Sequence, residues 1–128
     1  MNIIYLAGPM SGMPDLNRPV FAEAARNLRY QGYKVVSPHE LNHNRPLADV
    51  GRDRAYEDYI WLDTAQGLIR CDTLVLLPGW VYSRGAKDEF GMASAWGYAI
   101  GFWDVHRETI VWMYDFTETS AFKPGKLL

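Results

Sequence analysis

The stretch Ile3-Ile4-Tyr5-Leu6-Ala7, followed by Gly8-Pro9-Met10-Ser11-Gly12, decides the fold class of this chain. Five consecutive apolar or aromatic residues closed by Gly-Pro are typical of a strand buried on both faces, as strands of parallel sheets are. The segment from Gly8 to Pro19 contains two glycines and three prolines, which predict a loop. We therefore expect Ile3 to Ala7 to form the first strand of an α/β sheet.

Helical and strand patterns alternate along the rest of the chain. Apolar residues recur at helical spacing at Phe21, Ala24, Ala25 and Leu28, and Gly32 is placed to end that helix. Further elements are expected as a strand at 33–37, a helix from 54 to 70, a strand at 72–77, a helix from 85 to 97 and a strand at 109–114. This alternation predicts a single α/β domain over residues 1–128, with a Rossmann-like, doubly wound parallel sheet.

The segment 98–108 fits this pattern least well. It either prolongs the preceding helix or forms a loop whose aromatic side chains pack on a neighbouring subunit. Large side chains crowd this part of the chain, namely Trp96, Tyr98, Ile100, Phe102 and Trp103. Because a small core has difficulty burying all of them, we expect a homo-oligomer, most simply a two-fold dimer.

The composition limits the classes of partner. The 128 residues include 13 basic and 15 acidic side chains, a net charge of −2, which argues against a surface built to bind nucleic acid. The sequence has no run of roughly 20 apolar residues and no signal-peptide pattern, so we expect a cytoplasmic protein without membrane contact. Cys71 is the only cysteine, and we expect it to be a small buried residue.

The loop after the first predicted strand is the first candidate for a ligand site. Ligands of open parallel sheets bind beyond the carboxyl ends of the strands. Glycines in such a loop let backbone N–H groups approach a phosphate or a ribose, so Gly8, Met10, Ser11 and Gly12 are candidate binding residues. A plain strand-to-helix turn would use the same residues.

The loop after the strand at 72–77 is the second candidate. It runs from Gly79 through Ser83 and Gly85 into a helix whose first turn is expected to carry Asp88 and Glu89. A helix N-terminus favours negative charge and would keep Glu89 ionised, as a carboxylate nucleophile requires. Capping of the helix by Ser83 is the structural alternative.

Asp63, in the middle of the predicted helix 54–70, is the third candidate. At 100° per residue it shares a helix face with Tyr56, Tyr59 and Gly67. The opposite face carries Leu62, Ala65 and Ile69. An acid in such a position either lies on the surface or lines a pocket together with the tyrosines and the glycine.

These segments, taken together, resemble a known family. Tyr5-Leu-Ala-Gly-Pro-Met10 with Ser11-Gly12, the mid-helix Asp63, Leu77-Pro-Gly-Trp80 and Ser83-x-Gly-Ala-x-x-Glu89 are similar to the nucleoside 2-deoxyribosyltransferase superfamily. The resemblance covers residues 2 to 97. It is closest to small uncharacterised members from phages and prophages and to the 2′-deoxynucleoside 5′-monophosphate N-hydrolases.

The resemblance implies cleavage of an N-glycosidic bond without a cofactor. By this resemblance, Glu89 is the nucleophile that attacks the anomeric carbon of the deoxyribose, and Asp63 is the acid that protonates the departing base. Tyr5 matches the tyrosine that orients the nucleophile. A covalent glycosyl-enzyme forms, and either water or a second base then takes the sugar; the sequence leaves hydrolysis and base transfer open.

One departure from the family pattern concerns the substrate. Transferases of this family that act on free nucleosides carry an aspartate six residues before the nucleophile, where this chain has Ser83. The monophosphate hydrolases have a serine there that binds the 5′-phosphate. The resemblance therefore implies a nucleoside monophosphate as substrate, and the phosphate candidates are Ser11, Gly12, Arg18, Ser83 and Gly85.

The remaining polar and aromatic candidates have weaker support. His39 and His43 have the spacing of metal ligands, but their segment has no helical period and the family uses no metal, so we expect none. Asn42 or His43 could contact the base, and Asp115 with residues 117–120 could complete a neighbouring subunit's site. Trp80 could stack on a base or pack under its loop.

Two other classes of function stay open beside the enzyme. A protein of this fold can bind a nucleotide without turning it over, and a structural or partner-binding protein can keep the fold. The presence of both Asp63 and Glu89 favours the enzyme, because a pure binder has no need of two carboxylates beside an anionic ligand.

Overall fold

Strand β1 (Ile3–Ala7) lies inside a five-stranded sheet in the computed structural model, which describes residues 2–41, 63–64 and 66–114. The other strands are β2 (Lys34–Val36), β3 (Thr73–Leu76), β4 (Ala99–Asp104) and β5 (Thr109–Trp112). The helices are α1 (Arg18–Tyr30) and α3 (Arg84–Ala95). Four short 3-10 turns are η1 (Pro14–Asn17), η2 (Pro38–Glu40), η4 (Leu68–Arg70) and η5 (Trp80–Tyr82).

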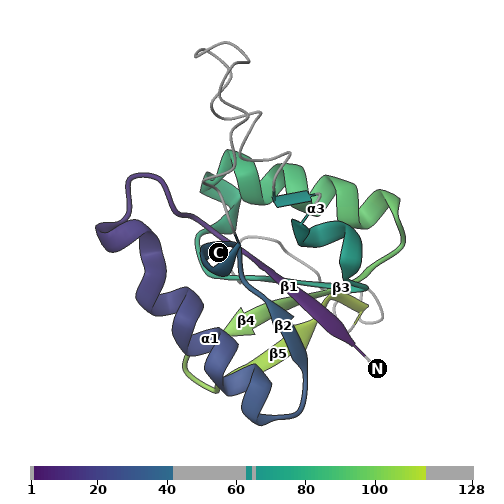
Figure 1. Ribbon diagram of the computed structural model, residues 1–128, viewed down its shortest axis with the longest axis horizontal. Helices are drawn as coiled ribbons and strands as arrows, with labels where there is room; N and C mark the ends of the chain where they lie inside the picture. Colours follow the sequence, from purple (N-terminus) through teal and green to yellow (C-terminus); the bar gives the residue numbers. More distant parts are fainter. Residues whose placement is uncertain (1, 42–62, 65, 115–128) are drawn as a thin grey trace.

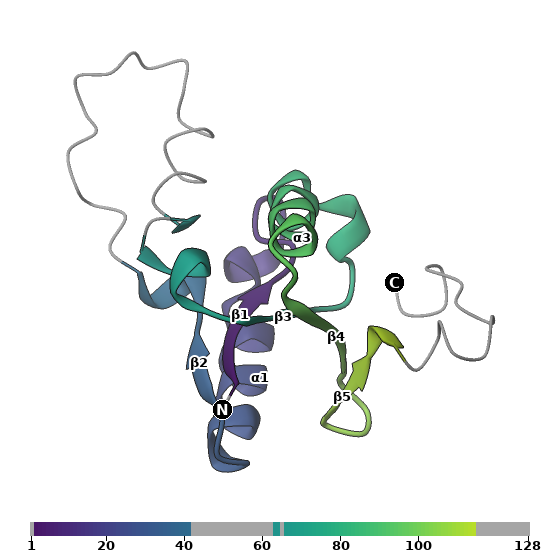
Figure 2. The same ribbon diagram turned by 90° about the vertical axis from the view of Figure 1, so that its right-hand side faces the viewer.

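The strand order is β2-β1-β3-β4-β5, which can be followed across the sheet in Figure 2. The pairs β1–β2, β1–β3 and β3–β4 are parallel, whereas β4–β5 is antiparallel. The α/β class and the Rossmann-like fold expected from the sequence are therefore confirmed. The expectation of an all-parallel sheet is wrong for the last strand only, because a tight turn joins β4 to β5 where a crossover helix would be needed for a parallel pair.

Alternate residues of β1 pack on opposite faces of the sheet. Ile4 and Leu6 join the cluster beneath α1, whereas Tyr5 and Ala7 join the cluster beneath α3. Figure 1 shows the two helices on opposite sides of the sheet. All four side chains are fully buried, as expected for a strand with no face toward water.

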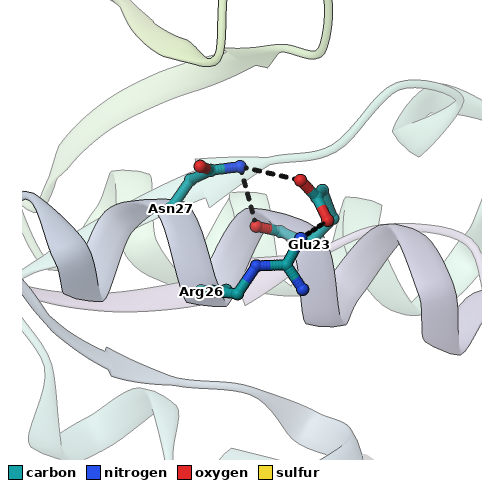
Figure 3. A network of polar contacts seen from close by, with 3 residues as sticks. All are labelled: Glu23, Arg26 and Asn27. Carbon is teal, nitrogen blue, oxygen red and sulfur yellow. Dashed lines mark hydrogen bonds and ion pairs between the residues drawn. The ribbon is translucent and has the colours of Figure 1, made fainter.

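Helix α1 has the core-facing stripe that its sequence predicts. Phe21, Ala24, Ala25 and Leu28 are buried, and Gly32 follows with φ +100°, the left-handed conformation that glycine adopts most easily. Figure 3 shows part of the polar contacts along this helix. The side-chain amide of Asn27 donates to the backbone carbonyl of Glu23 (3.1 Å) and to its carboxylate (3.2 Å), and Arg26 pairs with the same carboxylate.

The segment 98–108 differs from both expected forms, because residues 99–104 are strand β4. Gly97, with φ +77°, ends α3, and the strand then runs beside β3 with four consecutive buried residues. Ile100, Phe102 and Trp103 are 8%, 2% and 4% exposed within this one chain. These three side chains therefore need no neighbouring subunit to cover them, whereas Trp96 is 45% exposed and Tyr98 is partly buried. Homo-oligomerisation stays a prediction, and only Trp96 and Tyr98 still support it.

The predicted helix 54–70 is described only in its last part. Residues 63, 64 and 66 are helical, but the chain then tightens into η4. As a result Leu68 is fully buried and Ile69 is 60% exposed, so the expectation that Ile69 shares the apolar face is wrong. Tyr56, Tyr59 and Leu62 lie outside the described residues, as does Ala65.

Within the ranges given above, no helix is long and apolar enough to cross a membrane.

Gly101 provides a test of how closely β4 and β5 pack. A Cβ atom there would overlap Cγ2 of Ile110 and lie 3.2 Å from Cε3 of Trp112. We predict that Gly101→Ala lowers the free energy of unfolding by about 1–3 kcal/mol, the usual cost of overpacking. Urea denaturation measures the change. Gly91→Ala is the matched control, because a Cβ at Gly91 meets nothing within 4 Å; equal effects of the two substitutions would contradict the prediction.

Candidate functional site

Two loops that follow neighbouring parallel strands meet at one edge of the sheet. Ala7 of β1 is paired with Leu76 of β3, and the contact continues beyond the strands, where the Leu77 N–H donates to the Ala7 carbonyl at 2.8 Å. Gly8 permits this approach, since a Cβ there would lie 2.8 Å from Cβ of Leu77. The loop after β1 therefore lies beside the loop after β3.

Three ionisable side chains from three elements interact beside these loops. Tyr5 comes from β1, Asp63 from the helical residues before η4, and Glu89 from α3. Tyr5 is fully buried, Glu89 is 5% exposed, and Asp63 is partly buried. The charges of Glu89 and Asp63 both raise the pKa of Tyr5, and the charge of Asp63 raises the pKa of Glu89. The three residues that the resemblance implies for catalysis are thus neighbours.

Glu89 is held as an acid rather than as a carboxylate. Burial, and then repulsion by Asp63, raise the pKa of Glu89 to about 8; interaction with the Tyr5 hydroxyl opposes this shift, and Asp88 adds to it. The expectation that the helix start keeps Glu89 ionised is therefore wrong for the free protein. Helix α3 begins at Arg84 and has no acid in its first turn, so Glu89 lies where the helix dipole has largely faded and burial dominates.

Tyr5 places its hydroxyl in the same buried environment. Burial, followed by the charges of Glu89 and Asp63, raises the pKa of Tyr5 well above its usual value, so the phenol stays protonated. Its oxygen is inaccessible to water and makes no hydrogen bond of standard geometry in the part of the chain that the structure describes. The hydroxyl is therefore a donor that lies beside Glu89 and can stabilise the ionised form of that residue.

Ser83 caps α3. Its hydroxyl oxygen accepts a hydrogen bond from the Ala86 N–H at 3.1 Å. This is the structural role that the sequence left open, and it leaves the hydroxyl proton able to donate elsewhere. Gly85, in the first turn, is partly exposed beside it.

The loop after β1 carries the other phosphate candidates. Ser11 and Gly12 are exposed, and Met10 packs on the cluster beneath α1. Arg18 is exposed at the start of α1 and forms an ion pair with Asp15 at 3.4 Å. Part of its charge is therefore already compensated within the loop.

Trp80 is packed inside the α3 side of the core. It is 8% exposed, and its ring lies 5.1 Å from that of Phe90 and 6.3 Å from that of Phe102. Of the two roles that the sequence allows, packing under the loop is the one observed, because a ring in this position has little open face for a base.

The segment after β2 is fastened to α1. Arg29 donates to both carboxylate oxygens of Glu40 (3.0 and 2.6 Å) and to the Val35 carbonyl (2.8 Å). This arrangement fixes η2, where the His39 ring packs edge-on against Phe21. In the ranges the structure describes, no group of three or more His, Cys, Asp or Glu residues could hold a metal ion. Asn42, His43, Asp115 and residues 117–120 lie outside those ranges.

One residue of the site was not assigned a role from the sequence. Gly67 shares a helix face with Asp63, and the structure places it against the Tyr5 ring. The sequence placed this glycine on the helix face of Asp63 as a possible lining residue of a pocket, but the contact with Tyr5 could not be predicted from that spacing.

Comparison with known proteins gives a family but no activity. Residues 2–102 match the family described as Domain of unknown function (DUF4406). No curated protein matches the chain.

The raised pKa of Glu89 makes a prediction about stability. Between pH 4.5, its ordinary pKa, and about pH 8, the folded protein keeps a proton that the unfolded chain has released. The free energy of unfolding should therefore fall as the pH rises through this range. Glu89→Gln cannot titrate, so the decrease in the free energy of unfolding that Glu89 causes should be absent in this variant. Urea denaturation of both proteins across the range measures it. Parallel pH dependence in the two proteins would show that Glu89 titrates normally.

Proposed function

We propose a function from the site itself, since the family to which this chain belongs, Domain of unknown function (DUF4406), has a description that names no activity. The proposed activity is cleavage of the N-glycosidic bond of a 2′-deoxynucleoside 5′-monophosphate in the cytoplasm. The observation that carries the proposal is the meeting of Glu89 and Asp63 beside the Tyr5 hydroxyl on the α3 side of the sheet. The resemblance to the nucleoside 2-deoxyribosyltransferases supports the same roles.

In the first chemical step, the Glu89 carboxylate attacks the anomeric carbon. The bond from this carbon to the base breaks, its electron pair goes to the base nitrogen, and protonated Asp63 supplies the proton to the base. A glycosyl ester on Glu89 results. In the second step, water or another base attacks the same carbon, Glu89 leaves as a carboxylate, and Asp63 accepts the proton of the incoming group.

Glu89 must lose its own proton before it can attack. Because the buried pair holds a proton on Glu89 in the free protein, transfer of this proton to Asp63 produces both reactive forms at once. The Tyr5 hydroxyl favours the transfer, since its interaction with Glu89 lowers the pKa of that residue.

The first prediction of this proposal concerns the two carboxyls. We expect Glu89→Ala to abolish the release of free base from a deoxynucleoside monophosphate, and Asp63→Asn to slow it by about 10²-fold or more, the usual scale of general acid catalysis. Chromatography of the reaction mixture measures the base. Asp88→Asn, an exposed neighbour of Glu89, is the control and should retain turnover. Normal turnover in Glu89→Ala would refute the mechanism, and binding without turnover in the wild type would favour a nucleotide-binding module.

The 5′-phosphate is assigned to Ser83 and the start of α3. Backbone N–H groups and the dipole of this helix attract an anion, and the Ser83 hydroxyl proton is free to donate while its oxygen caps the helix. Charge-assisted hydrogen bonds of this kind contribute about 1.5–3 kcal/mol each, so two of them change specificity by roughly two to four powers of ten.

This assignment predicts a substrate preference that a matched pair of variants can test. Asn and Asp both cap helices well, so Ser83→Asn and Ser83→Asp preserve the cap and differ in charge. We expect kcat/KM of the wild type to favour the monophosphate over the nucleoside by about 10²-fold or more. Ser83→Asp should lose this preference through repulsion, and Ser83→Asn should keep most of it. Equal rates on both substrates in the wild type would mean that Ser83 is a cap alone.

A further inference from the structure

Gly67 lies at the end of the helical segment that carries Asp63, and its position is fixed from several sides. The Gly67 N–H donates to the Asp63 carbonyl at 2.9 Å, and the Cys71 thiol donates to the Gly67 carbonyl at 3.4 Å. In the next residue, the Leu68 carbonyl accepts a hydrogen bond from the Tyr98 hydroxyl at 2.7 Å. The turn after Asp63 is thus held in place by groups that take no part in the proposed reaction.

The space around Gly67 leaves no room for a side chain. A Cβ atom there would lie 2.7 Å from Cε1 of Tyr5, 3.0 Å from the Asp63 carbonyl oxygen and 3.1 Å from Cδ1 of Leu41. The φ of Gly67 is −129°, which is not the left-handed region that favours glycine, and the need for glycine is inferred from space alone.

The two nearest neighbours cannot move aside cheaply. Tyr5 is fully buried and belongs to a strand that pairs with both β2 and β3, and its ring is rigid. The Asp63 carbonyl belongs to the helical hydrogen bond described above. Only the end of the Leu41 side chain is flexible, so a methyl group at position 67 must displace either the Tyr5 ring or the turn after Asp63.

We propose that Gly67 is a positioning residue of the site: by lacking a side chain, it lets the turn after Asp63 lie directly on the edge of the Tyr5 ring and so sets the separation of the Asp63 and Glu89 carboxyls. Gly67 itself touches no reacting atom. This inference rests on the proposed function for its meaning, but the separation that it sets is a property of the free protein and can be measured without a substrate.

The test is Gly67→Ala, with the pKa of Glu89 measured by NMR of carboxyl-labelled glutamate. The groups that act on Glu89 are Tyr5 from β1, Asp63 from the helical segment, and Asp88 from α3 itself. Displacement of the turn admits water and separates the two carboxyls, which removes the two largest causes of the raised pKa. We expect the pKa to fall from about 8 toward its ordinary value by about one unit or more, a tenfold change in proton affinity.

Gly91→Ala is the matched control, because it makes the same substitution on α3 where a Cβ meets no atom within 4 Å. It should leave the pKa of Glu89 unchanged. A folded Gly67→Ala protein with an unchanged pKa would overturn the proposal. If Gly67→Ala does not fold, Tyr5→Leu combined with Gly67→Ala must fold, because the ring edge is then gone; a double variant that also fails to fold overturns the proposal.

Base release provides the second measurement. Displacement of the Tyr5 ring or of the turn after Asp63 is expected to lower kcat/KM by about 10²-fold in Gly67→Ala. Gly91→Ala should keep the wild-type rate. If the wild type releases no base, the proposed function fails while the pKa comparison still decides the role of Gly67. If base release is unaffected in Gly67→Ala, the positioning role is overturned and the proposed function stands.

Discussion

Strand β1 is buried on both faces, and the arrangement of the site depends on this constraint. A strand without a solvent face must alternate its side chains between two cores, so Ile4 and Leu6 pack under α1 while Tyr5 packs under α3. A slip of one residue in its pairing with β2 and β3 would exchange the two sets and place the Tyr5 hydroxyl on the α1 side, away from Glu89 and Asp63. The register of the sheet therefore fixes the height and the side at which the Tyr5 hydroxyl lies.

Helix α3 brings the Glu89 carboxyl to the Tyr5 hydroxyl. Its buried residues are Ala86, Glu89 and Ala93, which are spaced as the core-facing stripe of a helix. An acid in a stripe of this kind loses its hydration, and the raised pKa of Glu89 records that cost. A core of this size gains nothing in stability from such a group, so its presence is a local conflict of the kind found at functional sites.

The sequence predicts the layers of this molecule better than its electrostatics. Short apolar runs reveal β1 and β3, and helical spacing reveals α1, because burial on a regular element leaves a periodic trace. The sequence did not predict strand β4 (residues 99–104), because both faces of this strand are apolar. The alternation of apolar and polar residues that distinguishes a strand from a buried helix is therefore missing. The raised pKa of Glu89 could not be predicted either, since desolvation depends on what packs against the core-facing side of the helix, and the helix dipole visible in the sequence is the weaker effect.

The proton held by the buried pair of Glu89 and Asp63 links this pair to the proposed chemistry. An anionic nucleotide entering a site with two ionised carboxylates would meet strong repulsion, which a protein that only binds its ligand has every reason to avoid. A pair that retains one proton halves this repulsion, and the proton on Glu89 is the one that the departing base will need. In the proposed reaction, its passage through Asp63 to the base would leave Glu89 ionised when the anomeric carbon becomes electrophilic. The burial that raises the pKa of Glu89 would therefore store the proton for the leaving group of the proposed reaction, and the Tyr5 hydroxyl would stabilise the carboxylate that remains.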